Sequence, residues 1–366
     1  MYKTILVRSP NWIGDQILAF PFFYYLRKTF PNARITSACV SWVKDLQYTD
    51  LINEVFVLPS PRYASVIEKV RALNQAASDL RKRCDWDLAL SLPNSLSAAW
   101  LIYRSGARIR RGYRLEGRGL LLNDGLRWNP SAERHRAQAY LDLLPGQAHP
   151  DRRAIDFWGI PPMDETDPGT PAVLSGFDPS RSWTVKEVVK PPEEKYWVLA
   201  PGATAESRRW PIERFAQLSE RIHQETGLRG VVVGGAGEAS LAAYLCKDPR
   251  LKLLDRTAMG PVSCLWKIFK NALFTVTNES GLAHMASLCG SPVQIVCGAA
   301  NPTRTRPLGP GKVQVSLNAV DCWPCEKNYC MQPSDQKLKC LKGIEPDLVW
   351  EEIKRGFLDQ KKTASS

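Results

Sequence analysis

The stretch YWVLAPGATAESRRWPIERFAQLSERIHQETGLRGVVV, residues 196–233, decides the fold. It opens with an apolar run at Tyr196–Ala200 and passes through a glycine-containing loop into a helical pattern at Ile212–Thr226. It closes with a second apolar run at Gly230–Val233. Strand, helix and strand in this order form a βαβ unit, whose two strands are parallel and share one sheet. The stretch therefore predicts an α/β protein.

The same alternation extends along the chain in both directions. In the first half we predict strands at Thr4–Val7, Arg34–Val40, Val55–Leu58 and Asp87–Leu92. The predicted helices of this half are at Ile17–Thr29 and Val66–Lys82. In the second half we predict further strands at Lys252–Leu254, Leu273–Thr277 and Val293–Cys297. The further helices of this half are predicted at Glu238–Cys246, Val262–Lys270 and Gly281–Cys289. Two α/β domains in tandem, with a cleft between them, fit this pattern.

A polar, proline-rich stretch from Asp164 to Glu194 interrupts the alternation and is typical of an interdomain connection. The final segment, Asp347–Leu358, predicts a closing helix with Leu348, Trp350, Ile353 and Phe357 on one side. We therefore expect a first domain at residues 1–180 and a linker at residues 181–195. A second domain at residues 196–345 and a closing helix with a tail at residues 346–366 would follow.

The composition, 44% hydrophobic and 23% charged, argues against disorder, fibre and coiled coil. The basic excess is mostly N-terminal: residues 1–150 hold 21 Lys and Arg against 12 Asp and Glu, and the rest holds 28 against 25. This asymmetry suggests an anionic partner such as phosphate, nucleic acid or a membrane surface, with an ordinary basic surface as the alternative. The N-terminus lacks the apolar core of a secretory signal and no stretch could span a membrane. We therefore expect a cytoplasmic protein with at most peripheral membrane contact.

The turn after the first strand runs from Arg8 to Asp15 and contains Asn11 and Gly14. In an open parallel sheet such a turn lies at the carboxyl edge, where ligands bind. Asp15 sits where a helix N-cap would be, so capping is one interpretation. The other is a general base that deprotonates a substrate hydroxyl.

The loop after Tyr196–Ala200 contains Gly202, Ala203 and Thr204, and ends in Arg208 and Arg209. Backbone N–H groups and guanidinium groups together can hold a phosphate, although a solvated basic loop would look the same. The chain has no Walker A motif. The glycine-rich turn Gly234-Gly235-Ala236-Gly237 is a weaker indication of a nucleotide site. Within it, Gly235 is a candidate for binding the donor.

A third loop joins a strand to a helix and contains Glu279, Ser280, Gly281, Leu282 and His284. Ser280 could cap the helix while free N–H groups face a phosphate, and Glu279 could accept hydrogen bonds from ribose hydroxyls. A packed helix-face histidine is the alternative for His284. Together with the arginine loop, this third loop predicts a pocket for a nucleotide diphosphate.

The order of these motifs resembles that of glycosyltransferase family 9, the ADP-heptose:lipopolysaccharide heptosyltransferases. The resemblance covers most of residues 3–300 and is carried by Trp12-Ile13-Gly14-Asp15, Pro201-Gly202-Ala203, Arg208-Arg209-Trp210-Pro211 and Thr277-Asn278-Glu279-Ser280-Gly281-Leu282-Ala283-His284. The heptosyltransferase II branch in particular is similar at Leu92-Pro93-Asn94-Ser95, Arg110-Arg111-Gly112-Tyr113-Arg114 and Leu121-Leu122-Asn123-Asp124.

The resemblance implies a GT-B fold, with two Rossmann-like domains that bind the acceptor and the nucleotide-sugar donor. It implies an inverting, metal-independent transfer of heptose from ADP-L-glycero-D-manno-heptose to the phosphorylated lipid A core of lipopolysaccharide. Asp15 would be the catalytic base, and Arg208 or Arg209 would neutralise the leaving diphosphate. Ser280, Gly281, Leu282 and His284 would form the donor-phosphate loop. The alternatives are another nucleotide sugar, or a sugar-nucleotide or nucleic-acid binding protein without activity.

Two features depart from simple expectations. Glu279 stands where the family more often has aspartate. Asp85-Trp86-Asp87 matches the metal-binding D-x-D pattern of other glycosyltransferases, but it precedes a predicted buried strand and is interpreted as a strand-entry turn. This interpretation agrees with the metal-independent catalysis that the resemblance implies.

The arginines at 110, 111 and 114 lie in the basic half of the chain. Because arginine suits phosphate and carboxylate groups, we expect Arg110, Arg111 and Arg114, with Asn11 and Asn94, to bind the acceptor. The chain has no recognisable nucleic-acid-binding layout, so no nucleic-acid partner is expected.

Four of the ten cysteines cluster, at Cys322, Cys325, Cys330 and Cys340. Their spacing is compatible with a structural Zn²⁺ site. A reduced or labile thiol cluster is favoured instead, because the second pair lacks the compact C-x-x-C form. Catalysis would not depend on the cluster in either case. The six remaining cysteines lie singly and are expected to be buried small hydrophobes.

Overall fold

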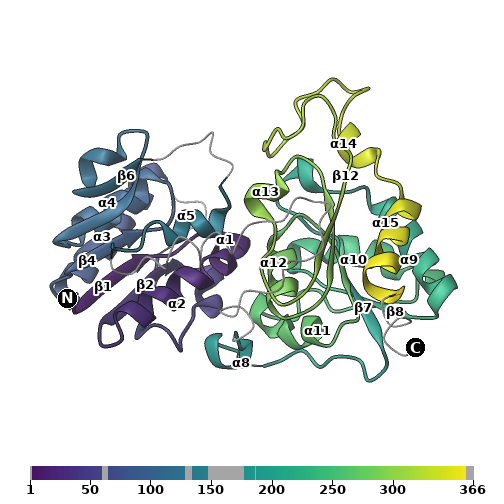
Figure 1. Cartoon of the computed structure of the whole chain (residues 1–366), viewed down its shortest axis with the longest axis horizontal. Coiled ribbons are helices and arrows are strands. Elements are labelled where there is room, and N and C mark those ends of the chain that lie inside the picture. The colour runs from purple at the N-terminus through teal and green to yellow at the C-terminus, as the bar shows by residue number, and fades with distance from the viewer. Residues whose placement is uncertain (1, 60–64, 128–133, 147–176, 186, 360–366) are drawn as a thin grey trace. The chain divides into compact units, whose positions relative to one another are not determined.

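The computed structural model describes residues 2–59, 65–127, 134–146, 177–185 and 187–359. These residues form two compact units, drawn in Figure 1. The N-terminal unit holds the described residues up to 146 together with Asp178–Thr184, and the C-terminal unit holds Phe177 and the described residues from Val185 on.

The N-terminal unit is built on a six-stranded parallel sheet with the order β3-β2-β1-β4-β5-β6. Apolar residues dominate its central strands, and Ile5, Leu6 and Val7 are fully buried, as expected of a sheet covered on both faces. The strands are β1 (Thr4–Arg8), β2 (Arg34–Val40), β3 (Glu54–Leu58), β4 (Leu88–Ser91), β5 (Ile109–Arg114) and β6 (Asp124–Arg127).

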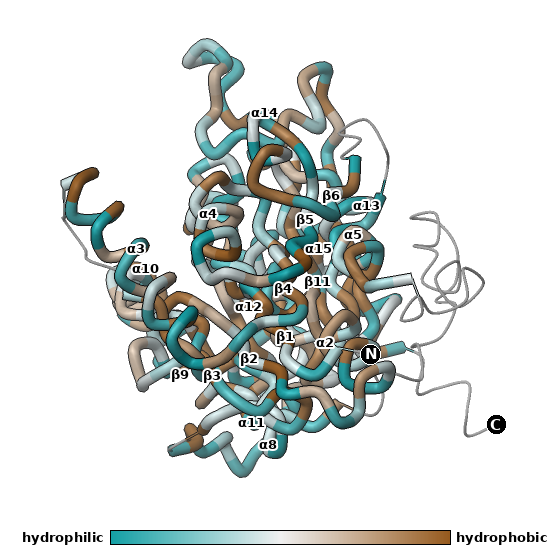
Figure 2. Tube along the Cα trace, turned by 90° about the vertical axis from the view of Figure 1, so that its left-hand side faces the viewer, coloured by the Kyte–Doolittle hydropathy of each residue, from teal (hydrophilic) through white to brown (hydrophobic). Residues whose placement is uncertain are grey.

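Helices α3 (Val66–Arg83) and α4 (Leu96–Arg104) of this unit begin at recognisable side-chain caps. Ser65 and Glu68 form a capping box at the start of α3, and the Ser95 hydroxyl accepts from the Ala98 amide at the start of α4 (3.2 Å). The first turns of α3 carry the exposed apolar residues Val66, Ile67 and Val70. Figure 2 shows brown, hydrophobic segments at one end of this helix. The α-helices are α1 (Ile13–Leu18), α2 (Phe20–Thr29), α3 (Val66–Arg83), α4 (Leu96–Arg104), α5 (Arg136–Leu141) and α8 (Pro179–Ser182).

The C-terminal unit repeats this sheet. Its six parallel strands have the order β12-β11-β10-β7-β8-β9, which is the order of the N-terminal sheet when the strands are counted from β7. The strands are β7 (Tyr196–Ala200), β8 (Arg229–Val232), β9 (Leu253–Asp255), β10 (Thr275–Asn278), β11 (Val293–Cys297) and β12 (Val313–Leu317). Both units thus have the strand order of the Rossmann fold, and each has one point where the order reverses, between β1 and β4 or between β7 and β10.

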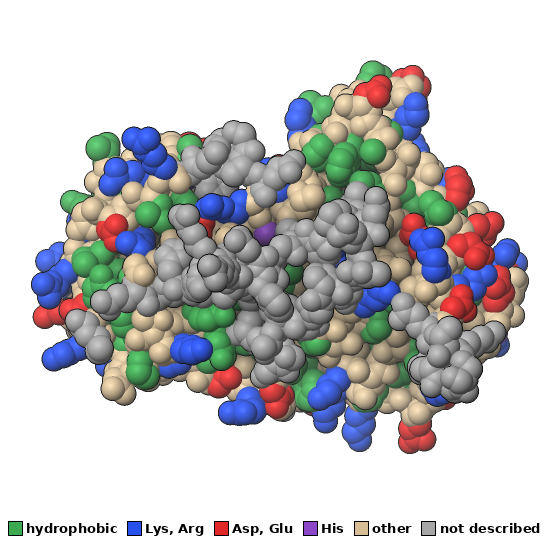
Figure 3. Space-filling model, in the orientation of Figure 1, with side chains coloured by type: hydrophobic (Ala, Val, Ile, Leu, Met, Phe, Trp, Pro, Cys, Tyr) green, Lys and Arg blue, Asp and Glu red, His purple; other side chains and the backbone are tan. Residues whose placement is uncertain are grey.

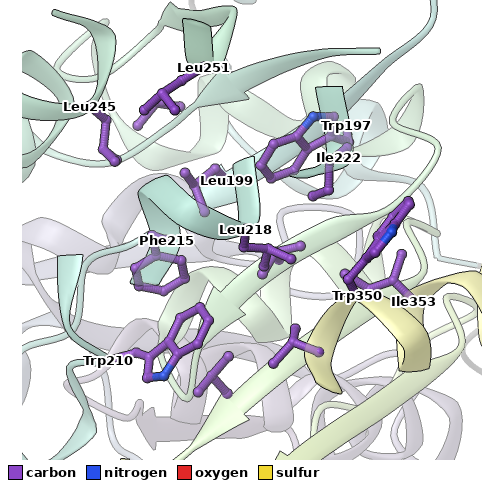
Figure 4. Packing of buried hydrophobic residues seen from close by; sticks show 14 of the residues in the cluster. Trp197, Leu199, Trp210, Phe215, Leu218, Ile222, Leu245, Leu251, Trp350 and Ile353 are labelled. Atoms are coloured by element: carbon purple, nitrogen blue, oxygen red, sulfur yellow. The ribbon is translucent and has the colours of Figure 1, made fainter. Parts of the chain in front are cut away.

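The core of the C-terminal unit contains three buried tryptophans, Trp197, Trp210 and Trp350 (Figure 4). Trp350 comes from the closing helix α15, which packs against α9. The α-helices are α9 (Ile212–Thr226), α10 (Ala239–Cys246), α11 (Trp266–Lys270), α12 (Gly281–Leu288), α13 (Pro302–Thr305), α14 (Lys339–Lys342) and α15 (Pro346–Ile353), and a π-helical turn at Lys354–Leu358 follows.

The predicted α/β class is confirmed. Helix α9 and strands β2, β7 and β11 have the predicted bounds, and strands β1 and β3 differ from them by a single residue. Strands β5, β6 and β12 were not predicted. The predicted helix at Ile17–Thr29 is two helices, the first beginning at Ile13. Leu348, expected on the buried side of the closing helix, is 49% exposed, and Val349 is buried instead. In the part of the chain that the structure describes, no helix is long and apolar enough to cross a membrane.

Candidate active site

Asp15 lies after β1, at the point where the strand order of the N-terminal sheet reverses. Helix α1 begins at Ile13 with Trp12 as its N-cap, so Asp15 is the third helical residue. The expectation that it occupies the N-cap position is therefore wrong, because the helix starts two residues earlier than the apolar pattern indicates. Its side chain is 29% exposed, and Oδ1 lies 3.8 Å from Nε of Arg136 on α5.

A second side chain of α5 contacts the same carboxylate. Tyr140 lies one helical turn after Arg136 and is 4% exposed, with its side chain hydrogen-bonded to Asp15. Burial, and secondarily the negative charge of Asp15, hold the pKa of Tyr140 well above its ordinary value. The phenol therefore stays protonated and donates to the carboxylate. The sequence patterns did not indicate either α5 residue.

The side chain of Arg8, which is 6% exposed, stabilises the turn that leads to Asp15. Its guanidinium donates to the Asn11 side chain and to the Ser9 carbonyl, and burial lowers the pKa of Arg8 to about 10. Trp42 Nε1 donates to the Asn11 carbonyl (2.6 Å). Asn11 was predicted to bind the acceptor. Both its side chain and its backbone carbonyl instead accept hydrogen bonds that stabilise the turn.

Asn94 follows β4, the neighbour of β1, and so lies at the same sheet edge as Asp15. Buried Arg118 donates to its carbonyl from Nη1 (3.2 Å) and fixes this loop. Within the described residues, Asn94 Oδ1 is buried without a hydrogen-bond partner. This oxygen is therefore an unsatisfied acceptor at the same sheet edge as Asp15.

The three predicted acceptor arginines of β5 are placed differently. Arg110 donates to the carbonyls of Ala107 (2.7 Å) and Leu121 (3.0 Å). Arg111 donates to Asp124 and to the Leu144 carbonyl, both at 2.7 Å. Both guanidinium groups are used inside the unit. Arg114 ends the strand at the carboxyl edge and is exposed.

In the C-terminal unit, two loops meet where the strand order reverses, after β7 and β10. Asn278, fully buried at the end of β10, ties them together. Its Nδ2 donates to the Pro201 carbonyl (2.6 Å), and its Oδ1 accepts from the Trp210 amide (2.9 Å). Asn278 belongs to the motif Thr277–His284 identified in the sequence, but its role in joining the two loops was not predicted.

The two neighbouring arginines of the first loop have different partners. Arg208 Nη1 lies 2.7 Å from Glu279 Oε2, and the two side chains are 30% and 7% exposed. Arg209 donates to the carbonyls of Ala203 (2.7 Å) and Thr204 (3.2 Å) of its own loop. Arg208 therefore joins the third loop, whereas Arg209 braces the first.

Glu238 packs closely against both glycine-containing turns. A Cβ at Gly202 would lie 2.4 Å from Glu238 Cγ, and one at Gly234 would lie 2.7 Å from Glu238 Cβ. These approaches require glycine, because real side chains do not come so close. Glu238 also accepts from the Gly235 amide (2.8 Å), so Gly235 gives its N–H to the protein rather than to a phosphate.

Ser280 is the N-cap of α12, as predicted. Its hydroxyl contacts Thr277 Oγ1 (3.3 Å), and among the described residues it makes no capping bond to the helix. The first-turn amides, including those of Gly281 and Leu282, are therefore not taken by this hydroxyl. His284 follows within the helix and is 4% exposed.

The four clustered cysteines lie in the segment 318–342, which contacts the arginine loop. The Ser207 amide donates to the Asn328 carbonyl (3.2 Å), and its hydroxyl donates to the Lys327 carbonyl. Lys337 pairs with Glu206 (2.8 Å). All ten cysteines are free thiols, and within the described ranges no three His, Cys, Asp or Glu residues are grouped so as to hold a metal ion. The single cysteines Cys84 and Cys246 are half-buried rather than buried.

Comparison with known proteins identifies the family. The profile of "Glycosyltransferase family 9 (heptosyltransferase)" matches residues 70–334, so the chain belongs to this family. The chain is 27% identical to lipopolysaccharide heptosyltransferase 2 of Escherichia coli K12 over 318 residues, 83% of this chain and 85% of the relative. It is 25% identical to lipooligosaccharide heptosyltransferase 2 of Haemophilus influenzae, over 83% and 86%.

Solved structures agree on the fold. The structure of E. coli ADP-heptose LPS heptosyltransferase II has a TM-score of 0.71 at 20% identity, over 98% of this chain and 99% of that one. E. coli heptosyltransferase WaaC with ADP has a TM-score of 0.68 at 16% identity, over 96% and 99%. The predicted glycosyltransferase class, GT-B fold and similarity to the heptosyltransferase II branch are confirmed.

Proposed function

We propose that the protein transfers heptose from ADP-L-glycero-D-manno-heptose to the inner core of lipopolysaccharide, with inversion and without a metal ion. Family membership supports glycosyl transfer. The observation that supports the proposed chemistry is a group of polar residues at each of the two points where the strand order reverses. The first is an acid, Asp15, and the second is a paired arginine, Arg208, beside the first-turn amides of α12.

In the proposed reaction Asp15 takes the proton of the acceptor hydroxyl, and the oxygen attacks the anomeric carbon as its bond to the diphosphate breaks. In-line displacement by an external oxygen inverts that carbon. ADP leaves with developing negative charge, which Arg208 and the amides of Gly281 and Leu282 would stabilise. Gly202, Ala203 and Thr204 would line the donor pocket, and Glu279 would orient Arg208 or bind the ribose.

The acceptor is proposed to be a phosphorylated lipid A core. Asn94 and Arg114 are the residues proposed to contact it, since Asn94 has a spare acceptor and Arg114 is exposed at the same edge. On the face drawn in Figure 3, Lys and Arg side chains outnumber acidic ones over the N-terminal unit, whereas both signs are mixed over the C-terminal unit. This distribution suits an anionic acceptor.

Peripheral contact with the cytoplasmic face of the inner membrane belongs to the same proposal. Val66 and Ile67, 76% and 64% exposed at the start of α3, stand beside Lys69 and Arg71. Exposed apolar residues with cations nearby in the sequence suit an anionic lipid surface. The intervening Glu68 is engaged with Ser65 in the capping box. We expect V66S/I67S to reduce co-sedimentation with vesicles containing anionic lipid. Retained binding would remove α3 from the contact.

The proposed donor is tested by calorimetric titration with ADP-, UDP- and GDP-sugars. We expect measurable binding of the ADP compounds and at least about tenfold weaker binding of the others, a difference of about 1.4 kcal/mol. A preference for UDP or GDP would overturn the heptosyl donor but leave the family and fold intact.

A further inference from the structure

The carboxylate proposed as the base is contacted by a helix far away in the sequence. Arg136 and Tyr140, both on α5, reach Asp15 from positions one helical turn apart. Residues i and i+4 of a helix lie on one face, so a single face of α5 presents a cation and a phenol to the same acid.

The two contacts differ in character. Tyr140 is buried, so its hydrogen bond to Asp15 comes from a side chain with little access to water. Arg136 is 34% exposed and lies at 3.8 Å, which gives a screened and less directional attraction. Of these two contacts, the phenol is the better suited to orient the carboxylate.

Helix α5 is itself held in place. The Tyr113 hydroxyl donates to the Ala139 carbonyl (2.7 Å), which fixes α5 against β5 next to Tyr140. At the start of the helix, His135 Nδ1 accepts from the Ala137 amide (3.2 Å). Such bracing matters because general-base catalysis depends on the alignment of the carboxylate with the hydroxyl it deprotonates.

We propose that Tyr140 is a positioning residue for Asp15: its phenol donates to the carboxylate and sets the orientation in which that carboxylate meets the acceptor hydroxyl. This inference rests on the proposed function, because it takes Asp15 as the base. It gives α5 a part in catalysis although Tyr140 touches no substrate.

The test is Tyr140→Phe, which removes only the hydroxyl. We expect kcat to fall between about 10- and 100-fold while the KM values for donor and acceptor stay within about twofold. Tyr196→Phe is the matched control, since that buried hydroxyl donates to the Ile268 carbonyl (2.8 Å) in the C-terminal unit. We expect it to lower the melting temperature similarly and to leave kcat unchanged.

The same substitution in an Asp15→Asn background separates the two proposals. If Tyr140 acts through Asp15, adding Tyr140→Phe to Asp15→Asn lowers the residual rate by less than about twofold. An unchanged kcat in Tyr140→Phe, or an equal loss with and without Asp15, would overturn the positioning role. Full turnover by Asp15→Asn alone would instead overturn Asp15 as the base.

Discussion

The two units share one sheet topology but hold their candidate sites in different ways. In the N-terminal unit a single acid is contacted by two side chains of α5, more than 120 residues later in the sequence. In the C-terminal unit two loops are joined by one buried asparagine and by close glycine packing around Glu238. Under the proposed function, the first arrangement would align one proton acceptor, and the second would shape the donor site. Identical strand orders would then support two chemical tasks, because different loops and helices follow the strands at the reversal points.

The largest expected effect is on the N-terminal side. Asp15→Asn should lower the transfer rate about 10²- to 10⁴-fold, because an amide cannot accept the acceptor proton. Donor binding, measured by calorimetry, should not change. Asp85→Asn is the control, since the exposed Asp85 precedes β4 and no role in the site is proposed for it. Wild-type turnover by a folded Asp15→Asn protein would leave Asp15 a structural residue only.

The joint of the C-terminal unit comes next. Asn278→Ala strands the buried Trp210 amide and Pro201 carbonyl, and each unsatisfied group costs about 1–3 kcal/mol. We expect a lower melting temperature together with weaker ADP binding. Asn271→Ala, on the exposed end of α11, provides the comparison with a small effect. Unaltered thermal unfolding in Asn278→Ala would show that the loops are held by other contacts.

The two arginines of the donor loop should separate binding from bracing. Arg208→Ala should weaken ADP binding roughly 10- to 150-fold, as expected for a lost charge-assisted contact of about 1.5–3 kcal/mol. Arg209→Ala should weaken it less and act mainly on stability, because Arg209 bonds to its own loop. Titration calorimetry and thermal unfolding of both variants measure the difference. Equal, negligible changes in affinity would place the loop outside the donor site.

The smallest effect is expected at the acceptor edge. Arg114→Gln should raise the acceptor KM and flatten its salt dependence, by about 1 kcal/mol or less for an exposed contact. Arg111→Gln should instead lower the melting temperature, since it breaks bonds to Asp124 and the Leu144 carbonyl. Steady-state kinetics from low to high salt distinguishes them. An acceptor KM that moves in Arg111→Gln but not in Arg114→Gln would reverse this assignment.

The sequence patterns predict the central strands well because these carry uninterrupted buried apolar residues, as in Tyr196–Ala200. Strand β5 has no such pattern, since three of its six residues are arginines whose charge hides the strand. The sheet-edge location of the candidate loops also follows from the sequence. The separate partners of Arg208 and Arg209 do not, because adjacent identical residues carry no signal of direction. Tyr140 was not predicted because its contact joins distant parts of the chain.

The segment that supports the arginine loop also has a practical use. Of the ten cysteines, Cys322 is the exposed one. It belongs to the segment 318–342, which bonds to Ser207, the neighbour of Arg208. A thiol-reactive fluorophore should therefore attach first at Cys322 without any engineered cysteine. The dye would then stand where a movement of the donor loop alters its emission, so that nucleotide binding could be followed in real time on the natural chain.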